Sequence, residues 1–368
     1  MQTLGTRNAP EMAPATATKL AGEAQQQRPA PDRPSVATRV ARGMAFDKIG
    51  AIYVWALIAL VFAIWVPDRF PQYATVKQVL NANAMTALAA LSITIPLTTR
   101  TFDLSFAFTM TMAGVTTAHF VAVGSPLAIA IGAGIVVALL IGLVNATVVV
   151  VMKIDSFIAT LATGSLIQAL ITMATGDTPI QSLRLAGPFS KIGQTELFGI
   201  TLPVYYALVV ALGIWYLLEH TATGRRLYAT GFNPDAARLA GVSVDRLRFM
   251  SLVVSGVLAG VAGIVLASTL QSGSPTAGDP YLLPAFAAAF LGATQLKHGR
   301  FNAWGTIIAV LLLGTGTTGL ALANAPQWAA NMFVGVVLIA SLAVTGIQRR
   351  QTTGRGRFSL ARLRRASA

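Results

Sequence analysis

The sequence lacks cysteine entirely and has little charge and few histidines, and each scarcity excludes a class of protein. With no cysteine in 368 residues, disulfides and thiolate metal sites are excluded. Charged residues make up 11% of the chain, against about a quarter in an ordinary soluble domain. His119, His220 and His298 lack the spacing of a metal site. We therefore expect neither a metal site nor a cofactor, and we do not expect a soluble globular domain.

The sequence also lacks the motifs of an enzyme. It contains no Gly-x-Ser-x-Gly elbow, no His-Glu-x-x-His pair and no glycine-rich phosphate loop ending in Lys-Ser or Lys-Thr. We predict no catalytic residue and no nucleotide hydrolysis through a P-loop. If the chain transports a solute actively without an ion gradient, a separate ATPase must supply the energy.

What the chain has in abundance is apolar residues in long runs. Hydrophobic residues make up 54% of the sequence, and the mean hydropathy is +0.65. A helix needs roughly 20 such residues to cross a bilayer. We predict an all-α polytopic membrane protein with about ten transmembrane helices. The expected spans cover residues 49–66, 79–98, 104–123, 126–152, 156–175, 200–218, 249–270, 280–296, 303–323 and 328–346.

Polar, proline and glycine residues inside these spans predict local features. The second span contains Asn81, Asn83 and Pro96, so we expect it to be irregular at both ends. The eighth span is short and interrupted by proline. Gly256 and Gly260 lie four residues apart in the seventh span, and we expect them to let helix backbones approach closely.

The two ends of the chain differ from the transmembrane domain, which we place at residues 47–347. Residues 1–46 are rich in Ala, Pro, Gln, Thr and Arg without apolar periodicity, and they predict a disordered basic tail. That tail has no apolar core before a small-residue cleavage site, so it does not resemble a signal peptide. Residues 348–368 form a second basic tail.

The net charge of +14 is explained by membrane topology and does not indicate a nucleic-acid partner. Ten spans put both termini on one face, which then holds 23 of the 27 Lys and Arg residues. The other face holds Arg69, Lys77, Arg184 and Lys191. Because loops rich in Lys and Arg stay inside, both termini and the loop at residues 219–248 are predicted to be cytoplasmic. The polar segment 176–199 then faces outward.

Ionisable residues are almost absent from the predicted spans. Ion-coupled carriers usually place such groups inside the helix bundle, so a neutral polar solute fits this chain better. Asp103, near a span boundary, is the main exception. It could contact a solute, cap the third span together with Ser105 or pair with Arg100, and a capping or pairing role is favoured. The candidate substrate pathway comprises Asn81, Asp103, Ser105, Asn145, Thr160 and Thr163.

The stretch Thr221–Arg248 is the longest polar run between spans on the cytoplasmic face, and it encodes a short helix. Asn233 can cap the first free amides, and Pro234 suits the first helical position. Asp235 favours the positive end of the helix dipole, and Gly241 can adopt the left-handed conformation past the last turn. Such a helix is either a docking element or an ordinary loop helix lying on lipid headgroups.

Several stretches together resemble bacterial ABC-importer permeases of the ribose/xylose class, over about residues 81–346. The loop from Thr223 to Val242, TGRRLYATGFNPDAARLAGV, resembles the cytoplasmic signature of that family. Phe102-Asp-Leu-Ser105 is similar to its Ile-Asp-Leu-Ser motif after the second span. Further similar segments follow in the same order at residues 155–163, 272–294 and 299–300.

The chain departs from that family pattern at several positions. Arg100-Thr101 stands where the family usually has a pair of glycines, and Phe106-Ala107 stands in place of Val-Gly. Pro284 replaces a common acidic residue, and Gly292-Ala293 replaces a Gly-Gly pair. Most of these positions lie in regions expected to line the pathway, so the resemblance does not imply a particular sugar.

The resemblance implies a subunit of an ATP-driven importer in the bacterial inner membrane, acting on a monosaccharide or a similar small neutral solute. Two such permeases, identical or related, would pair in the lipid bilayer, with two cytoplasmic ATPase subunits below and a periplasmic solute-binding protein above. Arg238 would pair with an acid of the ATPase, and the neighbouring alanines and Leu239 would supply apolar contact. The implied coupling helix comprises Asn233, Pro234, Asp235, Ala236, Ala237, Arg238, Leu239 and Gly241.

Other functions stay open from the sequence. A secondary carrier or facilitator would need no ATPase, although the sparse interior charge and the loop helix argue against it. A membrane scaffold or sensor would move no solute. Within the importer class, a deoxy-sugar, a nucleoside or a furanosyl signal molecule fits the sequence as well as a pentose or hexose does.

Overall fold

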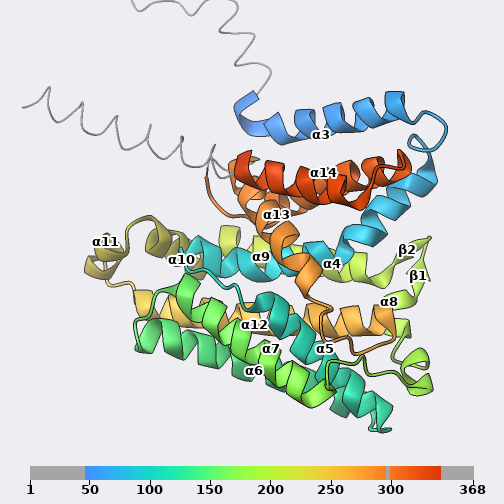
Figure 1. The fold of residues 1–368 in the computed structure, drawn as a ribbon. Helices are drawn as coiled ribbons and strands as arrows, with labels where there is room; N and C mark the ends of the chain where they lie inside the picture. Colours follow the sequence, from blue (N-terminus) through green and yellow to red (C-terminus); the bar gives the residue numbers. More distant parts are fainter. Residues whose placement is uncertain (1–45, 296–298, 341–368) are drawn as a thin grey trace, which may run out of the picture. The chain divides into compact units, whose positions relative to one another are not determined.

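The computed structural model describes residues 46–295 and 299–340, and these residues are mostly helical (Figure 1). A further helix, Gln327–Ala340, closes the described part. The two predicted tails lie outside the described residues, apart from Phe46. The long helices in chain order are α3 (Phe46–Trp65), α4 (Tyr73–Thr98), α5 (Phe106–Ala122), α6 (Leu127–Ala146), α7 (Ser156–Thr175), α9 (Leu202–His220), α12 (Val244–Leu270), α13 (Leu282–Gln295) and α14 (Ala303–Leu322).

Among the described residues, six helical segments are long and apolar enough to cross a membrane. These are Tyr73–Thr98, Leu127–Val151, Ser156–Thr175, Leu202–His220, Val244–Leu270 and Ala303–Leu322. Tyr53–Trp65, Phe106–Ala122 and Gln327–Ala340 are apolar but shorter. The prediction of a polytopic helical membrane protein is therefore confirmed. The count of ten spans and the side on which the termini lie stay predictions.

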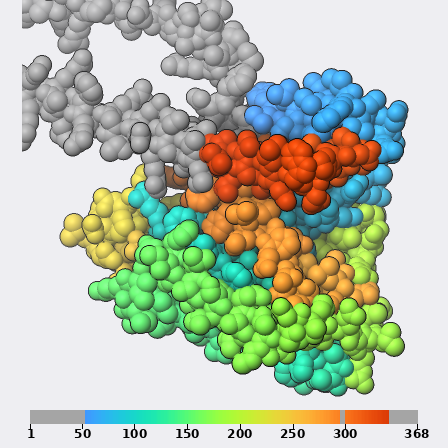
Figure 2. All heavy atoms as spheres, viewed as in Figure 1, coloured from blue at the N-terminus to red at the C-terminus, as the bar shows by residue number. Residues whose placement is uncertain are grey.

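Helices α4 and α12 lie at the centre of the bundle. In their most apolar stretch 72% of α4 and 67% of α12 is buried, compared with 22% of the span Leu127–Val151. α12 packs against α4, α5 and α6, while α4 also packs against α9, α13 and α14. α6 and α7 lie further out, and their green atoms form the lower part of the face seen in Figure 2. The contact between α4 and α12 therefore joins the group α5 and α6 to the group α9, α13 and α14.

Small residues on α12 make this close packing feasible. A Cβ atom added to Gly256 would lie 2.9 Å from the carbonyl oxygen of Ala138 on α6, which no real side chain tolerates. A Cβ on Gly260 would collide with the Ala138 side chain, and one on Gly263 would collide with the Met110 carbonyl on α5. The expected close approach at Gly256 and Gly260 is confirmed, because larger residues would push these backbones apart.

The expected irregularity of the second span is wrong, because α4 runs unbroken from Tyr73 to Thr98. Pro96 falls in the last turn, where only two helical residues follow it. The amide nitrogen of Asn83 donates to the Val79 carbonyl one turn earlier, at 2.8 Å. Asn81 instead accepts hydrogen bonds from Thr201, outside the helix. The side-chain bonds of both asparagines are therefore compatible with an unbroken α4.

The segment between α7 and α9, which the sequence analysis described only as polar, contains small elements. These are η2 (Leu183–Ala186), α8 (Lys191–Gln194), and the antiparallel strands β1 (Glu196–Leu197) and β2 (Ile200–Thr201). Phe198 and Gly199 form the two-residue turn with φ of +56° and +75°, the backbone that a tight hairpin needs. The hairpin and the α10–α11 segment lie at opposite ends of α9 in Figure 1.

Candidate functional site

The loop at residues 219–248 folds into two helices that share one capping residue. α10 (Ala222–Phe232) begins at Thr221, whose hydroxyl accepts the Gly224 amide at 3.1 Å. α11 (Pro234–Leu239) begins at Asn233, whose side-chain oxygen accepts the Ala236 amide at 3.1 Å. Asn233 is also the residue that ends α10, with extended backbone. The predicted helix start at Asn233-Pro234 is therefore confirmed.

The end of α11 has the double hydrogen bond of a Schellman motif. The Val242 amide donates to the Ala237 carbonyl at 2.9 Å, and the Gly241 amide donates to the Arg238 carbonyl at 3.0 Å. Gly241 adopts φ +79°, a backbone conformation that is unfavourable for residues with a Cβ atom. The predicted helix stop is confirmed, and it turns the chain directly into α12 at Val244.

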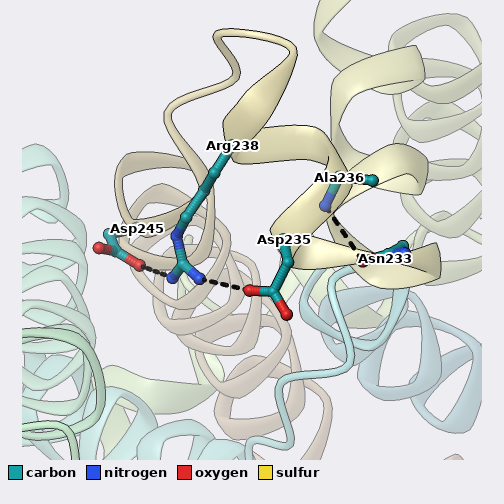
Figure 3. A network of polar contacts seen from close by, with 5 residues as sticks. All are labelled: Asn233, Asp235, Ala236, Arg238 and Asp245. Atoms are coloured by element: carbon teal, nitrogen blue, oxygen red, sulfur yellow. Dashed lines mark hydrogen bonds and ion pairs between the residues drawn. The ribbon is translucent and has the colours of Figure 1, made fainter.

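Arg238 connects α11 to the first turn of α12 (Figure 3). Its guanidinium lies 2.9 Å from the Asp245 carboxylate and 3.4 Å from the Asp235 carboxylate. All three side chains are about half exposed or more, so each pair contributes only ~0.5 kcal/mol to stability. The resemblance implies an acid of the ATPase as a partner of Arg238, and that pairing stays a prediction. Within its own chain Arg238 pairs with these two acids.

The residues of α11 divide into an inner and an outer set. Ala237 is buried within the chain, so it holds α11 in place and does not present a contact surface. Leu239 is 92% exposed, and Phe232 just before the helix is 66% exposed. Asp235 and Ala236 are exposed as well. α11 therefore presents an apolar tip at Leu239 beside a charged patch.

α10 fixes this segment to the helix bundle. A Cβ on Gly231 would collide with the Thr98 carbonyl at the end of α4, so α10 lies directly on that helix end. The Tyr228 hydroxyl donates to the Phe301 carbonyl at 2.8 Å, and the Arg300 guanidinium lies 5.4 Å from the Tyr228 ring centre. Burial raises the pKa of the Tyr228 hydroxyl further above its ordinary value, so it stays protonated and able to donate.

A buried polar network lies deeper in the bundle, around Asp103. The Ser105 hydroxyl and the Ser255 hydroxyl each donate to the Asp103 carboxylate at 2.7 Å, one to each oxygen. The Ser105 amide donates to the same carboxylate at 3.1 Å. Asp103 is 1% exposed, so these three donors replace the water that a carboxylate would otherwise bind. Asp103 thus holds the residue that precedes α5. Ser105, the N-cap of α5, makes no side-chain cap hydrogen bond itself, so the predicted joint cap by Asp103 and Ser105 is not formed in the usual way.

The network continues from Ser105 to the neighbouring helices. Asn145 on α6 donates to the Ser105 hydroxyl at 2.6 Å, and the Thr163 hydroxyl on α7 donates to the Asn145 side-chain oxygen. The Thr160 hydroxyl, also on α7, accepts the Leu104 amide at 2.9 Å. Five of the six predicted pathway residues therefore meet in one place, which joins the start of α5 to α6, α7 and α12.

Asn81 is the sixth predicted residue, and the structure places it elsewhere. Its side-chain oxygen accepts the amide of Thr201 at 2.9 Å and the hydroxyl of the same residue at 3.2 Å. It therefore supports the β1–β2 hairpin and takes no part in the Asp103 network. Ser255 is the network member that sequence reasoning missed. The sequence marks Ser255 only as a hydroxyl residue within an apolar stretch. Ser251 and Ser268 of α12 have the same pattern, so it does not single out Ser255.

Comparison with known proteins identifies the chain. A family model described as "Branched-chain amino acid transport system / permease component" matches residues 75–342. The chain belongs to this permease family. It is accordingly a multi-pass membrane transport component and not an enzyme, and its described residues include no group of His, Cys, Asp or Glu that could hold a metal ion.

Curated relatives of this permease match it over most of their length. The ribose import permease protein RbsC of Bacillus subtilis (strain 168) is 33% identical over 296 residues, which cover 80% of this chain and 92% of the relative. The L-arabinose transport system permease protein AraH of Escherichia coli (strain K12) is 33% identical over 82% of this chain and 90% of the relative. The D-allose transport system permease protein AlsC of the same strain is 25% identical over 81% and 91%.

A solved structure also resembles the permease, although weakly. One chain of a metal-chelate type ABC transporter in an inward-facing conformation is 14% identical, with a TM-score of 0.44 over 82% of this chain and 98% of that chain. At that level the likeness assigns neither a substrate nor a conformational state.

Proposed function

We propose that this permease is the transmembrane subunit of an ATP-driven importer for a monosaccharide or a similar small neutral polar solute. The observation that carries the proposal is the 33% identity to a ribose import permease along 92% of that relative's length. The relatives for L-arabinose and D-allose match over the same extent, so sugar import recurs among them. The scarcity of ionisable residues in the predicted spans supports a neutral solute.

The proposed assembly places partners on both ends of the helices. A cytoplasmic ATPase subunit docks on α11, where Leu239 is exposed. A periplasmic solute-binding protein docks on the segment 176–199 and the loop 273–279. A second permease copy or a related permease covers part of the exposed apolar surface of α6 and α7, and membrane lipid covers the rest. In this arrangement the chain crosses the inner membrane ten times and both termini are cytoplasmic.

Coupling follows a continuous series of contacts. An ATPase that moves α11 also moves the start of α12 through the Arg238–Asp245 ion pair. α12 carries Ser255, which holds the Asp103 carboxylate. Asp103 and Ser105 in turn hold α6 and α7 through Asn145 and its partner Thr163. A few kcal/mol of difference between two arrangements of these helices is enough to shift the transporter between its inward and outward states.

The test is reconstitution of the full chain in liposomes with its cognate ATPase and binding protein. A thermal-shift screen of the purified binding protein against pentoses, hexoses, deoxy-sugars and nucleosides names the solute. We expect accumulation of that solute only when ATP, the ATPase and the binding protein are all present. Equal uptake without ATP would identify a facilitator, and binding of nucleosides alone would replace the sugar with a nucleoside.

A further inference from the structure

A polar cavity of about 640 Å³ lies beside α11, on the side assigned to the cytoplasm. Three segments far apart in the sequence line it. They are the turn between α4 and α5, the stretch from the π-helix η1 (Thr147–Val151) to the start of α7, and α11 with the start of α12. The proposed transport function uses Arg238 and Asp245 at its rim and leaves the cavity itself without a role.

The cavity carries a surplus of positive charge. Its lining includes four cations and two carboxylates, a surplus of two positive charges. Both carboxylates already have partners in the chain. Asp245 is paired with Arg238, and Asp155 caps α7 by accepting the amides of Phe157 and Ile158 at 3.0 and 3.3 Å. The cations of the lining are Arg100, Lys153, Arg238 and Arg248.

Two of the cations occupy a backbone conformation that favours glycine. Arg100 and Lys153 both have φ of +59°, and each stands at a turn between two helices. A long side chain at such a position costs free energy that glycine would avoid. Residues held in this region cluster at binding and catalytic sites, where the interactions of the side chain offset the free energy of backbone strain. Here both side chains line the same cavity.

Arg248 contributes an unsatisfied donor to the same lining. Its Nε atom is buried and has no hydrogen-bond partner within the described residues. A buried N–H without an acceptor is unfavourable, so an anion in the cavity would remove that penalty. A guanidinium can donate two parallel hydrogen bonds to a phosphate or a carboxylate.

We propose that this cavity binds a phosphate group on the cytoplasmic face, presented either by an anionic lipid headgroup or by a soluble phosphate. A phosphate group offers about three acceptor oxygens, which matches donors that approach from three separate segments. A carboxylate offers two oxygens and one charge, which leaves part of the surplus uncompensated. Phosphate binding would fix the positions of α11 and the turns before α5 and α7 together, and so adjust how freely the coupling segment moves.

The test uses the full chain in nanodiscs of zwitterionic phosphatidylcholine, and it measures the melting temperature with and without inorganic phosphate at constant ionic strength. We expect phosphate to raise the melting temperature by about 2–3 °C at ten times its dissociation constant. Arg248→Gln should abolish this rise. Arg246→Gln is the matched control, because Arg246 is exposed, lies on the same helical turn and does not line the cavity. The measurement requires no transport, so its failure leaves the proposed function untouched.

A second variant guards against simple misfolding. Lys153→Gly removes a cavity cation while relieving the left-handed backbone, so the protein should fold at least as well without phosphate. Its response to phosphate should nevertheless be reduced. A phosphate response that is equal in the Arg248→Gln and Arg246→Gln variants would overturn the proposal, and so would the absence of any response in the wild type.

The source of the phosphate group is decided by changing the lipid. If anionic phosphatidylglycerol discs stabilise the wild type but not Arg248→Gln, and added phosphate then has no effect, a lipid headgroup occupies the cavity. If the response to inorganic phosphate persists in those discs, the ligand is soluble. If binding of the cognate ATPase abolishes phosphate binding in both kinds of disc, the cavity receives an acidic side chain of the ATPase and the proposal is wrong.

Discussion

The Ser255 hydroxyl donates a 2.7 Å hydrogen bond to the Asp103 carboxylate, although the two residues are 152 positions apart in the chain. This bond joins α12 to the start of α5 inside the bundle, where both side chains are buried. The other Asp103 oxygen holds the amide and hydroxyl of Ser105. The carboxylate is therefore the point at which helices from two halves of the sequence are held together.

Asp103→Asn should be tolerated far better than Asp103→Leu. The amide keeps one oxygen for Ser105 and can donate its NH₂ to the Ser255 oxygen, so few groups lose a partner. Leucine leaves three buried donors without an acceptor, at a cost of about 1–3 kcal/mol each. Thermal unfolding in detergent measures the difference, and similar melting temperatures for both variants would contradict this role for the carboxylate.

Ser255→Ala should destabilise the permease more than Ser251→Ala, by about 1 kcal/mol. Both serines are buried on α12, but the Ser251 hydroxyl donates mainly to the Arg248 carbonyl of its own helix, at 2.7 Å. Only Ser255 leaves a carboxylate oxygen short of a donor when its hydroxyl is removed. A pair of thermal melts decides it, and equal losses would mean that the Asp103 contact contributes nothing of its own.

Arg238→Glu should abolish uptake while leaving membrane insertion intact. The variant places a third acid beside Asp235 and Asp245, which separates α11 from the start of α12. The charge swap Arg238→Glu with Asp245→Arg distinguishes two roles for Arg238. Restored uptake would show that the pair within the chain is what matters. Continued loss would show that Arg238 also meets an acid of the ATPase.

Leu239→Asp should weaken binding of the ATPase without affecting folding, because the side chain is 92% exposed. Loss of a hot-spot side chain at the centre of an interface costs about 2 kcal/mol or more, and we expect Leu239 to be such a residue. Leu183→Asp is the matched control, since Leu183 is 95% exposed and lies on η2, outside the α10–α11 segment. Co-purification of the ATPase measures the effect, and full retention with Leu239→Asp would remove α11 as the docking element.

Gly241→Ala should cost about 1 kcal/mol of stability, and Gly213→Ala should cost nothing. Neither glycine has an atom within 4 Å of the added Cβ, so space is not the issue. Gly241 has φ +79°, whereas Gly213 lies inside α9. The paired melting temperatures isolate the backbone effect, and an equal response would mean that the Schellman turn is not strained by a side chain.

Local chemistry explains what the sequence could predict. Asn233, Pro234 and Gly241 mark the ends of α11 because capping and left-handed backbone depend on a few adjacent residues. The apolar runs locate the helices, since crossing a bilayer demands length. The pathway residues could be nominated because hydroxyl and amide groups are scarce in such runs, and five of the six meet around Asp103.

Relationships across the chain explain what the sequence could not predict. The partner of Asp103 depends on the rotation of α12 against α5, and nothing in the apolar run distinguishes Ser255 from Ser251. Arg238 finds Asp245 only because the Gly241 turn folds the chain back. The start of α12 at Val244, five residues before the expected boundary, was hidden because its first turn is polar.

The length of α12 has a mechanical consequence. Its 27 residues form one helix without an internal proline, which at 1.5 Å per residue is about 40 Å long. The hydrocarbon core is about 30 Å thick, so α12 is roughly 10 Å longer than a perpendicular crossing requires, and Asp245 lies in its first turn. A rod pivoting about its middle moves its two tips in opposite directions. A tilt of about 10° would carry each tip some 3 to 4 Å, so a push at the Asp245 end is reversed in direction at the Leu270 end.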